Sequence, residues 1–308
     1  MTPRLKFSLL SLASLLAIAL GLFAGALPDD RELARQILTE LRGPRVAAAF
    51  ACGGLLALAG ALMQTLFRNP LAEPYLLGVS GGAGLFALLG MVAGLAWPWV
   101  SGLAFLGSLL ALALAASLGG RLLARDHTPL LLAGVMLGAG FGALIALVLS
   151  LAPLHQLPGM LFFLMGDLAW IEHVGGLWLA LALAVAVSLV LARRLDVLQL
   201  APLKAASLGV AVAPTRWAVF ALAGACTSLV VAQAGSIGFV GLMVPHALRR
   251  LGFAGHRALL PAAALGGGCL LVLADALARS VAAPRELPVG VLTALIGVPL
   301  MLWLLRRP

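Results

Sequence analysis

Charged side chains are scarce in this chain of 308 residues, because Asp, Glu, Lys and Arg together make up only 10% of the sequence. Typical soluble domains carry about 25% charged residues, so a soluble fold of this size could not cover its surface with polar groups. Hydrophobic residues make up 63% instead. The shortage of charge excludes a soluble enzyme, a secreted disulfide scaffold and a disordered chain.

Patterns for binding nucleic acid or nucleotides are missing as well. The net charge is +9, but no run of Lys or Arg exceeds two residues, so we expect the positive charge in loops and no nucleic-acid partner. The P-loop pattern G-x-x-x-x-G-K-[ST] does not occur. ATP is therefore not expected to bind this chain through that motif.

Residues that commonly bind metals are few and scattered. The cysteines lie inside apolar runs without C-x-x-C spacing, which is typical of small buried packing residues. Four histidines lie in or near expected loops or span ends, and none has a second His or Cys at ligand spacing. The sequence thus predicts no metal site and no bound cofactor. The residues concerned are Cys52, Cys226, Cys269, His155, His173, His246 and His256.

Long apolar runs fill most of the chain, and a bilayer-spanning helix needs about 20 apolar residues. The first run follows two basic residues as in a signal peptide, but it is longer than the usual signal core. We therefore predict an all-α, polytopic integral membrane protein with about ten transmembrane helices, in which residues 1–308 form a single transmembrane domain. The expected spans are 5–27, 44–66, 76–96, 99–120, 129–151, 173–192, 215–234, 239–251, 258–281 and 288–305.

The charges between the runs test this count. When the N-terminus is placed inside and the sides alternate, most of the 20 Lys and Arg residues fall inside, and the outside becomes net negative. This bias agrees with the positive-inside rule, and a missed span would disturb it. We therefore predict an even number of spans, with both termini cytoplasmic. Gly235, Gly238 and Gly241 precede or begin the short eighth run, which indicates a helix that starts partway through the membrane.

Two connecting segments are long. Residues 28–43 have leucine and isoleucine at helical spacing and acidic residues near the start, which predicts a short amphipathic helix on the outer membrane surface. Residues 193–216 are polar at the ends and apolar between, and Pro202 and Gly209 divide them into two short pieces. Such an inner segment suits a cytoplasmic docking element, although a simple connector has the same pattern.

Three stretches carry more specific patterns. They are RGPR at 42–45 leading to RNPLAEPYLLGVSGGA at 68–83; GSIGFVGLMVPHALRR at 235–250; and HRALLP at 256–261, followed by LAD at 273–275, ELPVG at 286–290 and TALIGVP at 293–299. In this order and spacing they resemble the permease subunits of ABC importers for iron–siderophores, haem and cobalamin, the FecCD-like family. The resemblance covers about residues 42–307 and implies a type II ABC importer permease with the BtuC-like fold.

The residues around Asn69 have a physical meaning of their own. Pro70 and Pro74 disfavour the helical state in the residue before each, and such a break between spans is tolerated where backbone is buried or lines a cavity. The glycines that follow let a second helix approach. The resemblance implies that this turn is a cytoplasmic gate and that the loop before the fifth span is a second one. The gate residues are Asn69, Pro70, Leu71, Asp126, His127 and Thr128.

Arginines mark the outer ends of two spans, with Arg42 and Arg45 in the second and Arg279 in the ninth. They fit snorkelling anchors at the interface, whereas the resemblance implies that they dock a periplasmic binding protein by pairing with its glutamates. Exposed pairs of that kind mainly steer association and fix register. Asp275 precedes Arg279 by four residues and is placed to pair with it in one helix. Asp167 lies in an outer loop, where it suits a helix terminus or a partner contact.

The resemblance also implies that about residues 193–216 dock on an ATPase subunit. The family commonly has glycine followed by acidic residues here, whereas residues 201–204 of this chain read APLK; the SLGV of residues 207–210 is kept. The expected coupling residues are Asp196, Leu200, Lys204, Ser207, Leu208 and Gly209.

A complete assembly follows from the resemblance. Two copies would form a homodimer in the bacterial inner (cytoplasmic) membrane, with a path lined by the fifth and eighth spans and parts of the third and tenth. Two separate ATPase subunits would hold ATP and Mg, and a periplasmic binding protein would deliver a metal chelate. This chain would not itself be an enzyme, and the sequence does not distinguish an iron–siderophore from haem or cobalamin.

Two other classes fit the composition. A self-contained secondary transporter of about ten spans usually needs ionisable residues near the membrane midplane, and only Asp275 approaches such a position. An integral-membrane enzyme needs a convergent catalytic set, and none is visible in the sequence.

Overall fold

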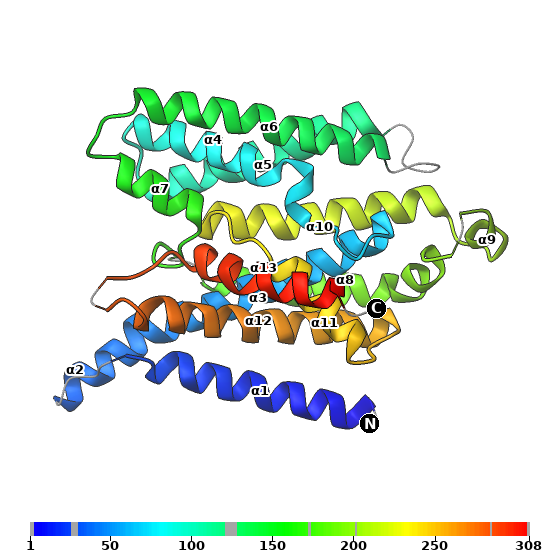
Figure 1. The fold of residues 1–308 in the computed structure, drawn as a ribbon, viewed down its shortest axis with the longest axis horizontal. Helices are drawn as coiled ribbons and strands as arrows, with labels where there is room; N and C mark the ends of the chain where they lie inside the picture. Colours follow the sequence, from blue (N-terminus) through cyan, green and yellow to red (C-terminus); the bar gives the residue numbers. More distant parts are fainter. Residues whose placement is uncertain are drawn as a thin grey trace.

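The computed structural model describes residues 3–25, 30–120, 128–171, 174–200, 202–283 and 285–306. Within these ranges the chain forms helices and turns but no strand, so the predicted all-α class is confirmed. The helices pack side by side in one bundle (Figure 1). They are α1 (Pro3–Phe23), α2 (Arg31–Gln36), η1 (Ile37–Arg42), α3 (Gly43–Phe67), η2 (Pro74–Leu77), α4 (Val79–Val92), α5 (Trp97–Gly119), α6 (Thr128–Leu151), α7 (Leu157–Met165), α8 (Val174–Leu198), α9 (Pro202–Ser207), α10 (Val212–Ala234), α11 (Val240–Arg250), α12 (His256–Ser280) and α13 (Val289–Arg306).

Each apolar run in which a span is predicted contains a helix. Among the described residues, seven helical stretches are long and apolar enough to cross a membrane: α1, the continuous stretch from α2 through α3, α5, α6, α8, α10 and α12. Two shorter apolar helices, Val79–Val92 and Val289–Trp303, match the third and tenth predicted spans. These helices support a polytopic membrane protein, and the count of ten crossings stays a prediction.

The central helix of the bundle is α3, whose residues are almost all buried from Val46 onward. It packs against α8, α10, α11 and α12. Glycines allow this closeness: a Cβ on Gly53 would overlap the carbonyl oxygen of Gly267 in α12, and one on Gly60 would overlap the backbone of Gly241 in α11. Contact through small residues is the usual way in which helices associate in lipid.

The glycines of α4 serve the same purpose, as the sequence predicts. A Cβ on Gly82 would overlap the carbonyl oxygen of Gly107 in α5, and one on Gly81 would lie 2.8 Å from the Cβ of Phe141 in α6. The glycine face of α4 therefore packs against both α5 and α6.

The break expected before α11 is confirmed. Residues 235–239 are not helical, and both Gly235 and Phe239 have positive φ angles, of 66° and 68°. The following helix has 11 residues. The backbone here cannot rely on helical hydrogen bonds, so other residues must satisfy its polar groups.

The segment before α3 is helical but does not stand alone. Asp30 caps α2 by accepting hydrogen bonds from the N–H groups of Glu32 and Leu33, and the π-helical turn η1 then runs directly into α3. The predicted helix within residues 28–43 is therefore confirmed over 31–42, and its place on the membrane surface stays a prediction.

The inner segment is partly an extension of its neighbours. α8 continues to Leu198, α9 is a single short helix, and Gly209 turns the chain with a φ of 78° before α10 begins. Within the segment predicted to form two short pieces, Pro202 begins one short helix and Gly209 follows its end.

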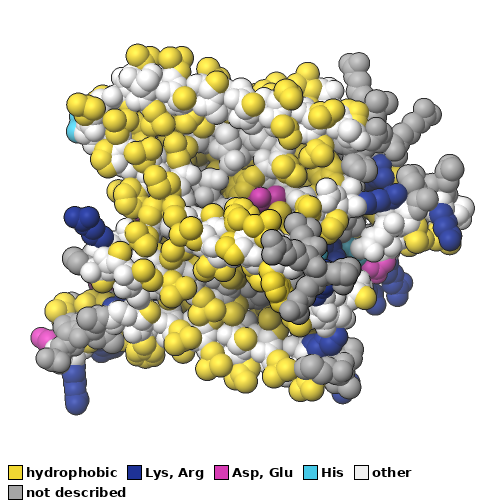
Figure 2. All heavy atoms as spheres, in the orientation of Figure 1, with side chains coloured by type: hydrophobic (Ala, Val, Ile, Leu, Met, Phe, Trp, Pro, Cys, Tyr) yellow, Lys and Arg dark blue, Asp and Glu magenta, His cyan; other side chains and the backbone are white. Residues whose placement is uncertain are grey.

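Charged side chains gather at the two ends of the bundle, and apolar side chains cover the broad band between them (Figure 2). An acidic side chain is also visible in a hollow near the middle of that band. α1 begins and α13 ends at the end of the molecule that carries α9 (Figure 1). This agrees with an even number of crossings, while the cytoplasmic location of that end stays a prediction.

Candidate functional site

The first predicted gate is a tight turn at the end of α3. Arg68 ends the helix with a φ of 49°. The side-chain oxygen of Asn69 accepts a hydrogen bond from the N–H of Leu71 at 2.9 Å, and the Asn69 N–H donates to the carbonyl oxygen of Gln64 at 3.2 Å. An asparagine that bonds the backbone two residues on is a common way to hold a turn. Asn69, Pro70 and Leu71 are all exposed, so this shaped turn is accessible.

The second predicted gate is only partly described. Asp126 and His127 lie outside the described residues, and Thr128 is the first residue of α6. A Cβ on Gly134 of α6 would overlap the carbonyl oxygen of Leu76 in η2. The helix that follows the second gate therefore touches the turn that follows the first.

Two residues just after the first gate hold the broken segment between α10 and α11. A carboxylate oxygen of Glu73 accepts a hydrogen bond from the N–H of Phe239 at 2.6 Å. The Tyr75 hydroxyl donates to the carbonyl oxygen of Ile237 and accepts from its N–H, both at 3.1 Å. These bonds satisfy backbone groups that have no helical partner. Burial raises the pKa of the Glu73 carboxyl, and the Phe239 hydrogen bond opposes that shift.

Sequence reasoning did not single out Glu73 and Tyr75 as functional. Two signals were present: a carboxylate directly before a proline in a strongly apolar stretch, and a tyrosine that is the only one in the sequence. Burial raises the pKa of the Tyr75 hydroxyl, so it stays protonated and can keep donating. The first gate and the broken helix are thereby one connected unit.

The beginning of the predicted coupling segment is bonded to two other helices. Asp196 at the end of α8 accepts hydrogen bonds from the backbone N–H of His256 at 2.9 Å and from its Nδ1 at 2.6 Å. The Nε2 of His256 lies 2.8 Å from the hydroxyl oxygen of Thr65 in α3. Arg68 donates from Nε and Nη2 to the carbonyl oxygen of Leu198, at 3.1 and 2.9 Å, and also bonds the carbonyl oxygen of Leu200. His256 and Thr65 were not predicted as functional, because a lone histidine at a span end carries no ligand spacing.

The remaining coupling residues form an exposed corner around α9. The Ser207 hydroxyl and the Leu208 N–H both bond the carbonyl oxygen of Lys204, at 2.9 and 3.3 Å. Leu208 is 59% exposed, so its apolar side chain is open to contact with a partner. Gly209 with its positive φ then ends the corner.

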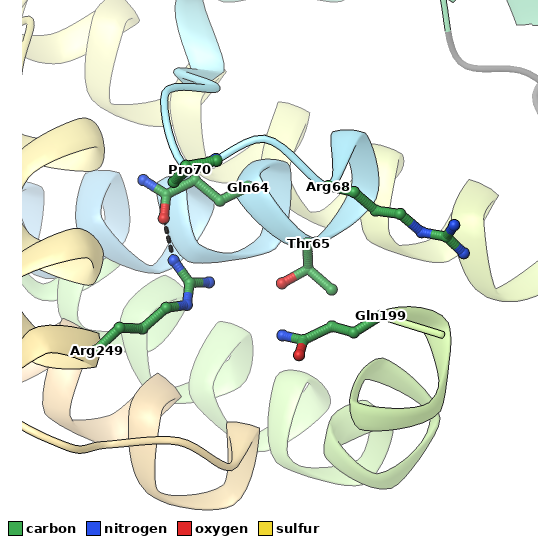
Figure 3. Close-up of a pocket in the computed structure, with 6 residues that line it drawn as sticks. All are labelled: Gln64, Thr65, Arg68, Pro70, Gln199 and Arg249. Atoms are coloured by element: carbon green, nitrogen blue, oxygen red, sulfur yellow. Dashed lines mark hydrogen bonds between the residues drawn. The ribbon is translucent and has the colours of Figure 1, made fainter. Parts of the chain in front are cut away.

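A cavity of about 290 Å³ opens beside the first gate. Figure 3 shows Arg249 of α11 reaching the side-chain oxygen of Gln64, while Arg68 extends away from them toward the end of α8. The Gln64 amide donates to the carbonyl oxygen of Leu242 at 3.1 Å. Pro70 of the first gate and Gln199, which lies within the segment 193–216, are far apart in sequence but meet around one cavity. Its lining residues are Gln64, Thr65, Arg68, Pro70, Gln199 and Arg249.

The three predicted docking arginines lie together at the opposite end of α3. Arg42, Arg45 and Arg279 all line one cavity of about 460 Å³, together with Glu40 and Glu286. Arg42 donates to the carbonyl oxygen of Leu22 at 3.1 Å. This cavity, the mouth, thus brings together Arg42 of η1, Arg45 of α3 and Arg279 of α12.

Asp275 binds two of these arginines. Its carboxylate oxygens lie 2.9 Å from Arg45 Nε and 3.0 Å from Arg279 Nε, which confirms the predicted pair within α12. Glu286 lies 2.7 Å from the Nη1 of Arg45. The Asp275 side chain is fully buried, and those of Arg45 and Arg279 are 14% and 9% exposed. Much of their charge is therefore balanced within this chain.

Asp167 lies near this mouth, in the link between α7 and α8. Its N–H donates to the carbonyl oxygen of Ala234 at 2.9 Å, and its carboxylate accepts from the N–H of Ala169 at 3.0 Å. Burial raises the pKa of this carboxyl, and the Ala169 hydrogen bond opposes the shift. Asp167 thus ties the link to the end of α10.

The cysteines are packing residues, as predicted: Cys52 and Cys226 are buried and Cys269 is half-buried. In the part of the chain that the structure describes, no group of three or more His, Cys, Asp or Glu side chains could hold a metal ion.

The sequence matches the FecCD transport family over residues 5–307. The chain belongs to this family. It is 39% identical over 311 residues to the vitamin B12 import system permease protein BtuC of Citrobacter koseri, covering 97% of this chain and 93% of the relative. It is 40% identical over 287 residues to the hemin transport system permease protein HmuU of Yersinia pestis, covering 88% and 83%.

Solved structures agree with this FecCD membership. A structure described as an inward-facing conformation of a metal-chelate type ABC transporter superposes with a TM-score of 0.89 and 32% identity, covering both chains completely. PsaBC from Streptococcus pneumoniae in complex with Fab superposes with a TM-score of 0.62 at 16% identity, covering 88% and 94%, which supports the fold alone. The predicted resemblance is thus confirmed, and the chain is an ABC transporter permease.

Proposed function

We propose that this FecCD-family chain is the permease subunit of an importer that moves a metal chelate from the periplasm to the cytoplasm. The observation that carries the proposal is the full-length similarity, at 32% identity, to a metal-chelate type ABC transporter. Relatives named for vitamin B12 and hemin support the same cargo class. An iron–siderophore, haem and cobalamin are the candidate cargoes.

Separate ATPase subunits are proposed to dock on the corner around α9. The exposed Leu208 and the short helix that precedes it support this assignment. ATP and Mg would be held by those subunits, so this chain would be neither an enzyme nor the holder of a cofactor. Movement of the coupling residues Asp196, Leu200, Lys204, Ser207, Leu208 and Gly209 would then operate the gates.

The mouth at the opposite end is proposed to receive a periplasmic binding protein. Three arginines converge there on one cavity, and their guanidinium groups would pair with a partner that carries carboxylates and fix its register. Docking would require such a partner to compete with Asp275 and Glu286, which already engage Arg45.

The translocation path is proposed to lie between two copies of the chain. Apolar side chains are exposed along α6 and α13, among them Met136, Leu147 and Leu295, and such faces suit a homodimer whose path is lined by α6, α11, α4 and α13. The gates would be Asn69–Leu71 and Asp126–Thr128. The assembly would lie in the bacterial inner membrane with ten crossings and both termini in the cytoplasm.

The alternative of a self-contained secondary transporter gains no support from the one charged residue that suggested it. Asp275 is held by Arg45 and Arg279 near one end of α12, so it is engaged in ion pairs rather than poised to carry an ion.

The decisive experiment is reconstitution of the chain with its ATPase and binding protein in proteoliposomes. We expect ATP-dependent uptake of one of the three chelates, and ATP hydrolysis that rises when the loaded binding protein is added. Chelate uptake that persists without any ATPase subunit would overturn the proposal.

A further inference from the structure

Three helices are bonded to one another at the α9 end of the bundle. The carboxylate of Asp196 in α8 accepts hydrogen bonds from both the backbone N–H and the Nδ1 of His256, the first residue of α12. His256 is fully buried, whereas the side chain of Asp196 is 44% exposed. A partly exposed carboxylate of the coupling segment thus reaches a histidine in the interior.

His256 is also hydrogen-bonded to α3. Its Nε2 lies 2.8 Å from the Thr65 hydroxyl, which in turn lies 2.8 Å from the carbonyl oxygen of Ala61. With a proton on Nε2, the ring donates to Thr65 and the hydroxyl donates to Ala61. Without it, the hydroxyl donates to the ring instead. The chain from Asp196 through His256 to Thr65 is continuous in either case.

A second connection closes a ring. Thr65 lies in the last turn of α3, where its carbonyl oxygen accepts the N–H of Arg68. The Arg68 guanidinium returns to the carbonyl oxygens of Leu198 and Leu200, just beyond Asp196. The path from α8 to α12, to α3 and back to α8 consists of hydrogen bonds throughout. Asn69, the first residue of the gate turn, directly follows this ring.

Such a polar chain is costly to bury and is not needed for packing alone. Buried polar groups cost free energy unless they are bonded, and apolar side chains of similar volume fill a core as well. Hydrogen bonds additionally fix the relative positions of the groups at the two ends of the chain. Here those ends are the coupling segment and the last turn before the gate.

We propose that Asp196, His256 and Thr65 are positioning residues that transmit movement of the coupling segment to the Asn69–Leu71 gate turn. The inference rests on the proposed function. A shift of the α8 end that displaces Asp196 would pull His256 and Thr65 with it. The hydrogen bonds from Arg68 to the carbonyl oxygen of Leu198 would make the gate turn move together with the end of α8. The ATPase would thereby move the gate through α3 and α12 as well as through the docking corner.

The test uses the complete complex in proteoliposomes and measures chelate transported per ATP hydrolysed. Thr65→Val removes the hydroxyl and keeps the shape, and we expect transport per ATP to fall by about fivefold, which corresponds to one lost hydrogen bond. Thr65→Ser restores the hydroxyl and should restore coupling. Asp196→Ala should resemble Thr65→Val, whereas Asp196→Asn keeps an acceptor oxygen and should lose less.

Thr227 provides a matched control. It is equally buried, and its hydroxyl makes the same 2.8 Å bond four residues back, to the carbonyl oxygen of Ala223 within α10. Thr227→Val should therefore leave transport per ATP unchanged. A double variant, Thr65→Val with Asp196→Ala, should be no worse than the worse single variant, because both break the same chain.

The outcomes separate this inference from the proposed function. A wild-type complex without ATP-dependent uptake would defeat the proposed function. Normal uptake in wild type and an unchanged ratio in Thr65→Val would overturn the transmission chain alone, and so would equal losses in Thr65→Val and Thr227→Val. A second readout is the maleimide labelling rate of Leu71→Cys: nucleotide should change it in the wild-type background and not in Thr65→Val.

Discussion

Asp275 in α12 accepts a hydrogen bond from Arg45 in α3 at 2.9 Å, with its carboxylate fully buried. The other carboxylate oxygen is 3.0 Å from Arg279, so two guanidinium groups from two helices share one buried negative charge. Removing one member of such a group costs more than the group contributes, because it leaves a charge uncompensated away from water. Charge therefore joins α3 and α12 at one end, and glycine packing joins them along their length.

Asp275→Asn should lower the free energy of unfolding by about 3–5 kcal/mol, because it leaves Arg45 and Arg279 without their shared carboxylate. Thermal unfolding of the detergent-solubilised chain measures this. Glu286 is the control, because it pairs with Arg45 but is 49% exposed. Glu286→Gln should cost less than about 1 kcal/mol. Equal melting temperatures for Asp275→Asn and wild type would contradict the role of the buried carboxylate.

Arg42→Glu should weaken binding of the periplasmic binding protein, and more strongly at low salt than at high salt, because exposed charges are screened. Arg42 is tested in place of Arg45, because Arg45 is bonded to the buried carboxylate of Asp275 and its replacement would also destabilise the fold. Surface plasmon resonance at two salt concentrations gives the measurement. Arg35→Glu, on the exposed α2, is the matched charge reversal and should change the affinity less. Unchanged binding in Arg42→Glu would show that this residue does not dock the partner.

Asn69→Ala should loosen the gate turn, because it removes the side-chain oxygen that accepts the Leu71 N–H. We expect ATP hydrolysis to continue while chelate uptake falls by several-fold, in line with about 1 kcal/mol for one hydrogen bond. Asn69→Asp keeps an acceptor at the same place and should retain more of the uptake. If both variants transport like wild type, the geometry of this turn does not control passage.

The Glu73 carboxyl predicts a pH dependence of stability. Burial raises its pKa in the folded chain, so the folded state favours the protonated form, and this contribution is lost as the pH rises through the folded pKa. The loss should begin above about pH 4.5, near the ordinary value for glutamate. Glu73→Gln keeps an oxygen for the Phe239 N–H and does not titrate. Melting temperatures measured from acidic to neutral pH should therefore fall for wild type relative to Glu73→Gln, and parallel curves would argue against a buried carboxyl.

The sequence predicted the parts of this molecule that depend on local pattern. Apolar run length located the helices, prolines located the turn at Asn69, and glycines located the break before α11 and the packing face of α4. The pair of Asp275 and Arg279 was predictable because residues four positions apart on a helix lie next to each other on its surface.

Contacts between residues far apart in the chain could not be predicted from local sequence patterns. Arg45 and Asp275 are separated by 230 residues and His256 and Thr65 by 191, and no periodicity relates such positions. His256 had no ligand spacing and therefore looked unremarkable, although it joins α8 to α3. The short eighth span was expected from its glycines. The unusual placement of Glu73 and Tyr75 in an apolar stretch was visible in the sequence, but their partners Phe239 and Ile237 lie more than 160 residues away and no local pattern relates them.

The burial of α3 has a consequence for how the protein is made. The ribosome synthesises α3 early, yet α8, α10, α11 and α12, which cover it, all follow it in the chain, and α12 begins only at His256. During this interval lipid must solvate the glycine-lined surface of α3, which its apolar sequence permits. The native core forms only when the C-terminal third has been inserted, so a nascent chain that stalls after α8 would remain an assembly intermediate whose central helix lacks the cover of α10, α11 and α12.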